Sequence, residues 1–134
     1  MTRDNKAILT VEDDQEALNA LRMQLERNFT DDYVLEFAQN VDEAISVIDD
    51  LVKENIELIL LLSDWYMPGK NADVLVNYIK GKNPGVRVIV LSGQLDTAKA
   101  GKMLEENVID RVIMKPWDES NLMNQIKGFL EENS

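Results

Sequence analysis

Short apolar runs alternate with longer amphipathic segments along the whole chain. Five runs are rich in Val, Ile, Leu and Phe but too short for ordinary helices, which predicts β-strands. These strands lie at residues 7–11, 33–38, 58–62, 86–91 and 112–114. The run Leu58–Leu62 contains no polar residue, a pattern typical of a strand buried on both faces of a parallel sheet. The run at 33–38 alternates only in part, as expected for an outer strand with one wetter face.

The segments between these runs carry apolar residues three or four positions apart, the spacing of an amphipathic helix. We predict helices at about residues 15–28, 41–51, 72–80 and 96–106, with a fifth after residue 118. Asp14, Asn40 and Asp118 precede three of these helices and are suited to N-capping. The fourth helix is the weakest, because its apolar face is little more than Met103 and Leu104.

Five strands that alternate with five helices predict an α/β fold with helices on both faces of a parallel sheet and right-handed crossovers. The expected architecture is a three-layer, doubly wound (βα)5 domain with the flavodoxin-like strand order 2-1-3-4-5. We expect residues 1–134 to form one domain, with an ordered core of about 6–131 and a polar tail at 131–134. In this order the first and third strands are neighbours, so their carboxyl ends converge at the edge where ligands bind.

Composition narrows the chemistry that the chain can perform. It is 45% hydrophobic and 29% charged, as in soluble globular proteins, and it contains no cysteine and no histidine. A metal would therefore need oxygen ligands, which favours Mg2+ or Ca2+. The net charge of −11 argues against nucleic-acid binding through phosphate contacts. The chain has neither an apolar stretch for a membrane span nor a signal peptide, so we expect a cytoplasmic protein.

Acidic residues follow the two strands that should lie side by side. Glu12 and Asp13 come directly after the first strand, and Asp64 ends the third. Carboxylates about 4 Å apart repel by several kcal/mol at an intermediate dielectric, so together they need a cation or a proton. Magnesium, with a few carboxylates, one carbonyl and several waters, is the natural cation for such a set. The alternative is that these acids are simply solvated at the rim of the sheet.

A hydroxyl and a lysine should reach the same edge from the fourth and fifth strands. Ser92 and Gly93 end the fourth strand, and Lys115 ends the fifth. Taken singly, each is more typical of a turn or of the surface. Jointly they describe a site in which Asp64 is the nucleophile for a phosphoryl group and these residues hold its oxygens. Phosphoryl transfer needs mainly positioning and charge stabilisation, so no separate base is required.

The chain resembles, over essentially its whole length, the receiver domain of bacterial two-component response regulators of the chemotaxis-regulator type. The matching motifs are Val11-Glu-Asp-Asp14, Asp64 with Met67-Pro-Gly69, Leu91-Ser-Gly93, and Lys115-Pro116. Four such motifs, in order at the ends of strands one, three, four and five, make the resemblance specific.

This resemblance implies a function, a metal and partners. A sensor histidine kinase or a histidine phosphotransfer protein would phosphorylate Asp64, and a downstream output domain or protein would respond. Mg2+ would be held by Asp13, Asp64 and the backbone carbonyl of Tyr66, with Glu12 acting through water. The bond before Pro116 is cis in the family. The chain would be no enzyme beyond its own phosphorylation and autodephosphorylation, and it would bind neither nucleic acid nor membrane directly.

Three departures from the family pattern and three competing readings stay open. Glu12 stands where Asp is common and is one methylene longer, so it could ligate the metal directly rather than through water. Val112 stands where an aromatic switch residue is frequent, and Tyr66 is bulky enough to restrict an attacking water. An aspartyl phosphohydrolase of the haloacid-dehalogenase kind would need a second Asp at the position of Tyr66. A flavodoxin-type module would need a phosphate loop in place of residues 12–14. A degenerate receiver could serve only as an interaction module, and the chain is either a stand-alone regulator or the receiver of a longer protein.

Overall fold

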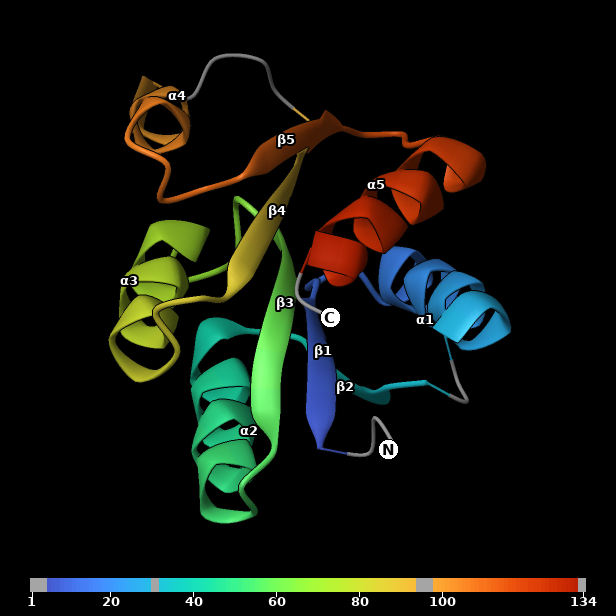
Figure 1. The fold of residues 1–134 in the computed structure, drawn as a ribbon. Helices are drawn as coiled ribbons and strands as arrows, with labels where there is room; N and C mark the ends of the chain where they lie inside the picture. The colour runs from blue at the N-terminus through green and yellow to red at the C-terminus, as the bar shows by residue number, and fades with distance from the viewer. Residues whose placement is uncertain (1–4, 30–31, 94–97, 133–134) are drawn as a thin grey trace.

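The computed structural model describes residues 5–29, 32–93 and 98–132, within which five strands alternate with five helices (Figure 1). The strands are β1 (Lys6–Val11), β2 (Val34–Ala38), β3 (Glu57–Asp64), β4 (Arg87–Ser92) and β5 (Arg111–Met114). The helices are α1 (Gln15–Phe29), α2 (Val41–Lys53), α3 (Ala72–Lys82), α4 (Ala98–Glu105) and α5 (Glu119–Glu132). Among the helices of these described segments, none combines the length and apolar character that a membrane crossing requires.

The five strands form one parallel sheet in the order β2-β1-β3-β4-β5, which confirms the predicted flavodoxin-like topology. The central strand β3 is flanked by β1 and β4, and its residues Leu58–Leu62 are at most 4% exposed. Burial on both faces is the reason for its unbroken apolar run. β2 lies at one edge of the sheet, and four of its five residues are only partly buried, as its mixed pattern predicted.

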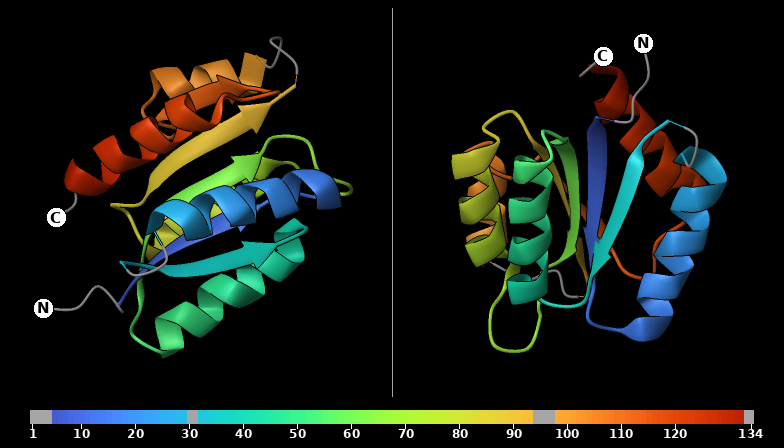
Figure 2. Two further views of the ribbon diagram at one scale, coloured as in Figure 1. Left: turned by 90° about the vertical axis from the view of Figure 1, so that its right-hand side faces the viewer. Right: turned by 90° about the horizontal axis from the view of Figure 1, so that it is seen from below.

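Helices cover both faces of the sheet, so the protein has three layers and two apolar cores. α2, α3 and α4 contribute to the core on one face, and α1 and α5 contribute to the core on the other (Figure 2). Successive strand residues supply the two cores alternately: Leu9 belongs to the first and Ile8 to the second. The three predicted N-caps are present, since Asp14, Asn40 and Asp118 accept backbone N–H groups of Ala17, Glu43 and Asn121 at 3.3, 2.7 and 2.9 Å.

Some boundaries and one burial prediction need correction. β4 begins at Arg87 rather than at Val86, because the Val86 N–H donates to the Asn83 carbonyl at 3.0 Å and closes the preceding turn. Leu104 does not lie on the buried face of α4: it is 39% exposed, and the buried residues of this helix are Ala100 and Met103. α5 continues to Glu132, so the predicted tail is helical at its start. The predicted start of the fourth helix at residue 96 lies outside the described residues.

Candidate functional site

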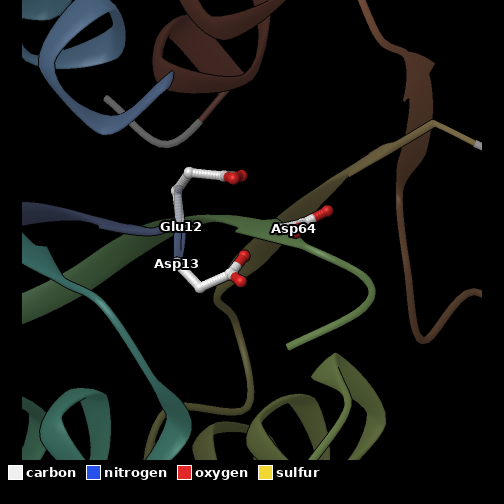
Figure 3. Close-up of side chains that lie close together, drawn as sticks. All are labelled: Glu12, Asp13 and Asp64. Atoms are coloured by element: carbon white, nitrogen blue, oxygen red, sulfur yellow. The ribbon is translucent and has the colours of Figure 1, made fainter. Parts of the chain in front are cut away.

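Three carboxylates meet at the carboxyl edge of the sheet, where β1 and β3 end (Figure 3). Each of Glu12, Asp13 and Asp64 offers one oxygen that lies within 4.8 Å of the others. Glu12 is fully buried and Asp64 is 7% exposed, whereas Asp13 is exposed. The alternation of side chains along an extended chain sends Glu12 and Asp13 to opposite sides of the β1 end, as Figure 3 shows. The parallel topology thus assembles an acidic group from two distant segments.

A single lysine joins two of these carboxylates. The Lys115 ammonium lies 2.8 Å from Glu12 Oε2 and 3.3 Å from Asp64 Oδ1. The backbone N–H of Lys115 donates to the Ser92 carbonyl at 2.8 Å, which fixes the end of β5 against β4. The Glu12 carboxylate also accepts the backbone N–H of Asp14 at 3.3 Å. The buried charge of Glu12 is therefore compensated by a cation and a hydrogen bond, as a buried charge requires.

The electrostatics of the site favour an added cation. The pKa of Asp64 is raised to about 6, because burial and the charge of Glu12 together raise it by more than the nearby Lys115 lowers it. Burial by itself lowers the pKa of Lys115, but its hydrogen bond to Glu12 and the charges of both carboxylates outweigh burial and raise it. Lys115 thus stays protonated, yet one ammonium faces three carboxylates. The site keeps a surplus of negative charge at neutral pH.

The donor set fits Mg2+. The ion prefers carboxylate, carbonyl and water oxygens and usually keeps several of its waters. Asp64 and the exposed Asp13 present oxygens within 4.8 Å of one another, while one oxygen of Glu12 is already engaged by Lys115. That engagement suits the indirect role expected of Glu12 better than direct ligation. The part assigned to the Tyr66 carbonyl stays a prediction, and the Tyr66 side chain is 42% exposed.

The loop after Asp64 is closed by backbone contacts on both sides. The Trp65 N–H donates to the Leu91 carbonyl at 3.0 Å, and the Trp65 carbonyl accepts the Ala72 N–H at 2.9 Å. Gly69 adopts φ +85°, a conformation that glycine allows without strain and that explains the Pro-Gly pair in this loop. Trp65 itself is 3% exposed and belongs to the core beneath α2, α3 and α4. The loop therefore leaves the sheet at a fixed point beside the carboxylates.

Ser92 and Gly93 lie at the same edge. Leu91 is paired with Asp64 across β3 and β4, so Ser92 stands one residue beyond the level of Asp64. Ser92 is 1% exposed, whereas Gly93 is exposed. The Lys115–Pro116 peptide bond is cis, as the resemblance implied. The residues singled out from the sequence thus come from the ends of four strands to one edge of the sheet.

Two contacts of the site were not foreseen from the sequence. One is the ion pair of Lys115 with Glu12, because the sequence analysis assigned Lys115 to the oxygens of a phosphoryl group and Glu12 to a metal ion. The other is a hydrogen bond from the Trp117 indole N–H to Gln24 Oε1 of α1, at 2.9 Å. A tryptophan directly after the Lys-Pro pair was the only available signal for this second contact. Its partner, 93 residues away, carries no motif.

A doubly wound sheet with acidic residues, a hydroxyl and a lysine at its carboxyl edge defines the receiver class of signalling domains. Residues 8–127 match the family model described as the response regulator receiver domain. The chain therefore belongs to the response regulator receiver domain family of two-component systems. Among curated protein sequences, none matches this chain at a significant level.

Solved structures support the same assignment. A CheY-like response regulator receiver domain protein from Methanospirillum hungatei is 28% identical, with a TM-score of 0.80, over 95% of this chain and 94% of that chain. The signal receiver domain of an HD domain-containing protein from Pseudomonas fluorescens is 26% identical, with a TM-score of 0.80 and 96% of both chains covered. A receiver domain protein from Clostridium thermocellum, 20% identical with a TM-score of 0.81 over 96% of both chains, shows the fold alone.

Proposed function

We propose that the chain is a phosphoacceptor signalling domain that receives a phosphoryl group on Asp64. The donor is a phosphohistidine of a sensor histidine kinase or of a histidine phosphotransfer protein. The observation that carries this proposal is the setting of Asp64: a buried carboxylate at the end of the central strand, 3.3 Å from the Lys115 ammonium and grouped with two further carboxylates. A structural aspartate at a turn would need neither the lysine nor the acidic neighbours.

The transfer step needs only groups that this site presents. An ionised Asp64 oxygen forms a new P–O bond, while the P–N bond of the donor breaks and its electron pair stays on the histidine nitrogen. With a pKa of about 6, Asp64 is mostly ionised at neutral pH and needs no general base. Lys115, the Ser92 hydroxyl and the Gly93 backbone N–H are the donors that hold the oxygens of the transferred group. Phosphoryl transfer depends mainly on such positioning and charge stabilisation.

Mg2+ is the metal that this mechanism requires. Asp13, Asp64 and the Tyr66 carbonyl would hold it, with Glu12 contributing through water, and the bound ion would neutralise charge on the phosphoryl oxygens. The support for this set is the cluster of oxygen donors and the absence of histidine and cysteine from the sequence. Lys115 keeps Glu12 in place and remains available to the transferred group.

We further propose that the domain acts on no substrate other than its own aspartyl phosphate, which it forms and hydrolyses. Its partners are the kinase or phosphotransfer protein and an output domain or protein, in a bacterial cytoplasm. Receiver domains are also found within larger proteins, as with the receiver of the HD domain-containing protein from Pseudomonas fluorescens. A phosphohydrolase function is disfavoured because Tyr66 occupies the position of the second aspartate that such an enzyme needs.

Intact-mass measurement after incubation with acetyl phosphate and Mg2+ tests the proposal. The wild type should gain one phosphoryl group, and the gain should be labile. Asp64→Asn should gain none, because the amide is a poor nucleophile. A gain at the wild-type rate in Asp64→Asn would show that the acceptor is another residue. Sustained turnover of a phosphate ester would instead favour the hydrolase, and failure of the wild type to gain any group would favour a degenerate receiver.

A further inference from the structure

The segment that carries Lys115 is tied to α1 by a contact of two half-buried side chains. The Trp117 indole N–H donates to Gln24 Oε1 at 2.9 Å. The Trp117 ring also packs against the apolar core that α1 and α5 share. Trp117 follows Lys115 by two residues, and the Lys115 N–H is bonded to the Ser92 carbonyl. Residues 115–117 are thus attached to β4 at one end and to α1 at the other.

α1 also follows closely on two of the three carboxylates of the site, Glu12 and Asp13. It begins at Gln15, two residues after Asp13, and the Asp14 side chain caps its first turn. Gln24 lies further along the same helix, so one element connects Glu12 and Asp13 to the segment that carries the lysine. The segment that carries the lysine and the segment that carries Glu12 are therefore both attached to α1, the first through the contact between Trp117 and Gln24. A long lysine side chain has much conformational freedom, so a more mobile backbone at residue 115 would reduce the time that the ammonium spends beside the two carboxylates.

We propose that Trp117 and Gln24 are positioning residues for Lys115, and that their hydrogen bond sets the affinity of the site for a phosphoryl group on Asp64. This inference rests on the proposed function. Neither residue touches the reacting atoms. Each acts on the phosphoryl group through the lysine. Loss of the contact should therefore weaken binding of the phosphoryl group and its mimics but not of Mg2+, because a less confined ammonium competes less for the Asp64 carboxylate.

An ion pair between α1 and the first residue of α5 supplies a matched control. Arg27 donates to both oxygens of Glu119 at 2.8 and 2.9 Å. Arg27 lies one turn after Gln24, but both partners of this ion pair are exposed, at 57% and 37% of their side chains. Glu119 also lies two residues further from Lys115 than Trp117 does. Loss of this pair tests whether any loosening between the two helices would have the same effect.

The experiment compares Gln24→Met, which removes the acceptor at nearly the same size, with Gln24→Glu, which keeps an acceptor oxygen. Trp117→Phe removes the N–H donor and keeps a buried ring, and Arg27→Met is the control. For each folded variant the rate of phosphorylation by acetyl phosphate is measured by intact mass. Calorimetry gives the affinity for Mg2+ alone and for beryllofluoride in saturating Mg2+. The 19F spectrum of bound beryllofluoride reports on the surroundings of its fluorines, which include the lysine ammonium.

We expect Gln24→Met and Trp117→Phe to weaken beryllofluoride binding and to slow phosphorylation by roughly tenfold, the lower end of the range usual for groups that orient a functional side chain. The 19F signals should shift in both variants, while the affinity for Mg2+ should not fall below the wild-type value. Gln24→Glu and Arg27→Met should behave like the wild type. The double variant Gln24→Met/Trp117→Phe should lose no more than either single variant, because both remove the same hydrogen bond.

Three results would overturn the inference. Gln24→Met could bind beryllofluoride as tightly as the wild type, or Mg2+ affinity could fall in parallel, or Arg27→Met could show the same loss as Gln24→Met. Thermal melts identify variants that lose activity through unfolding. If Trp117→Phe does not fold, the comparison of Gln24→Met with Gln24→Glu decides the question. Failure of the wild type itself to be phosphorylated or to bind beryllofluoride would instead count against the proposed function.

Discussion

Asp64 combines burial with dense negative charge, although the nucleophilic role proposed for it requires an ionised carboxylate. The residue is 7% exposed, and its carboxylate stands beside Glu12 and Asp13, with Lys115 as the compensating cation. The pKa of about 6 expresses this balance: the group is destabilised as an anion but still mostly ionised at neutral pH. Carboxylates grouped in this way repel one another, and a bound cation or proton reduces that repulsion.

The pH dependence of stability should carry this signature in the metal-free protein. Because the folded pKa of about 6 lies above the ordinary value of 3.8, the folded state binds the proton more tightly than the unfolded chain. The stability contributed by Asp64 is therefore fully present below about pH 4 and is lost as the pH rises to 6. Asp64→Asn does not titrate, so its Tm relative to the wild type should rise between pH 4 and 7 in EDTA. A difference in Tm that is independent of pH would contradict the raised pKa.

Thr10 offers a test of stability away from the chemistry. Its side chain is 0% exposed on β1, and its hydroxyl has no hydrogen-bond partner among the described residues. Thr10→Val replaces that hydroxyl by a methyl group of the same shape, and we expect it to stabilise the protein by about 1 kcal/mol. Denaturant unfolding measures the change, with Thr10→Ala as the control that should destabilise by leaving a cavity. A lower stability for Thr10→Val would mean that a buried water satisfies the hydroxyl.

At the scale of the elements, α4 is the helix with the fewest anchors. In its eight residues only Ala100 and Met103 are buried, and an ion pair of Lys99 with Asp73, at 2.5 Å, joins it to α3. Exposed ion pairs contribute little, and the Lys99 side chain is 66% exposed. Val112 on β5 is partly buried against the same core and has a single stiff χ1, so it has no aromatic ring to swing.

We therefore expect a phosphoryl mimic to act mainly on the fourth βα unit. Beryllofluoride with Mg2+ should change hydrogen exchange most between residues 92 and 106 and least in α1 and α2, because regions with few buried contacts open at low free-energy cost. Residues 94–97, which the prediction includes, lie outside the described residues. Asp64→Asn under the same conditions is the control and should show no change. Protection confined to residues 64–70, with α4 unaffected, would contradict this view of the switch.

At the scale of the whole molecule, a net charge of −11 means that cations should stabilise the protein in two ways, by general screening of its charge and by specific binding at the carboxylate site. Salt of any kind screens the repulsion among these charges and should raise the Tm slightly. Mg2+ should raise the Tm further than NaCl of equal ionic strength. At 100 times its Kd, specific binding should add about 2.7 kcal/mol to the free energy of unfolding.

The specific part of this response should require the site. Asp13→Ala should respond to Mg2+ and NaCl almost equally, and in EDTA it should be more stable than the wild type because one repelling carboxylate is gone. An unchanged Mg2+ response in Asp13→Ala would remove this residue from the metal site. A lower Tm of the variant in EDTA would mean that Lys115 already relieves the repulsion.

The sequence by itself determined the fold class and the edge at which the site lies. Apolar periodicity located the five strands and five helices, and parallel pairing requires the carboxyl ends of β1, β3, β4 and β5 to meet at one edge. Residue type then limited the chemistry: with no histidine and no cysteine, oxygen ligands and a lysine remain. The exact ends of the elements did not follow from the pattern: Val86 has strand propensity, but its N–H closes the preceding turn, so β4 begins one residue later.

The tertiary structure decided which partners these residues take. The contact of Lys115 with Glu12, 103 residues apart, spans the end of the sheet from β5 to β1 across the two strands between them, and no periodicity encodes such a contact. The same is true of Trp117 and Gln24, whose hydrogen bond arises because α1 and α5 cover the same face of the sheet. Local pattern determines secondary structure through backbone geometry, whereas the contacts that tune a site form only when distant elements pack together.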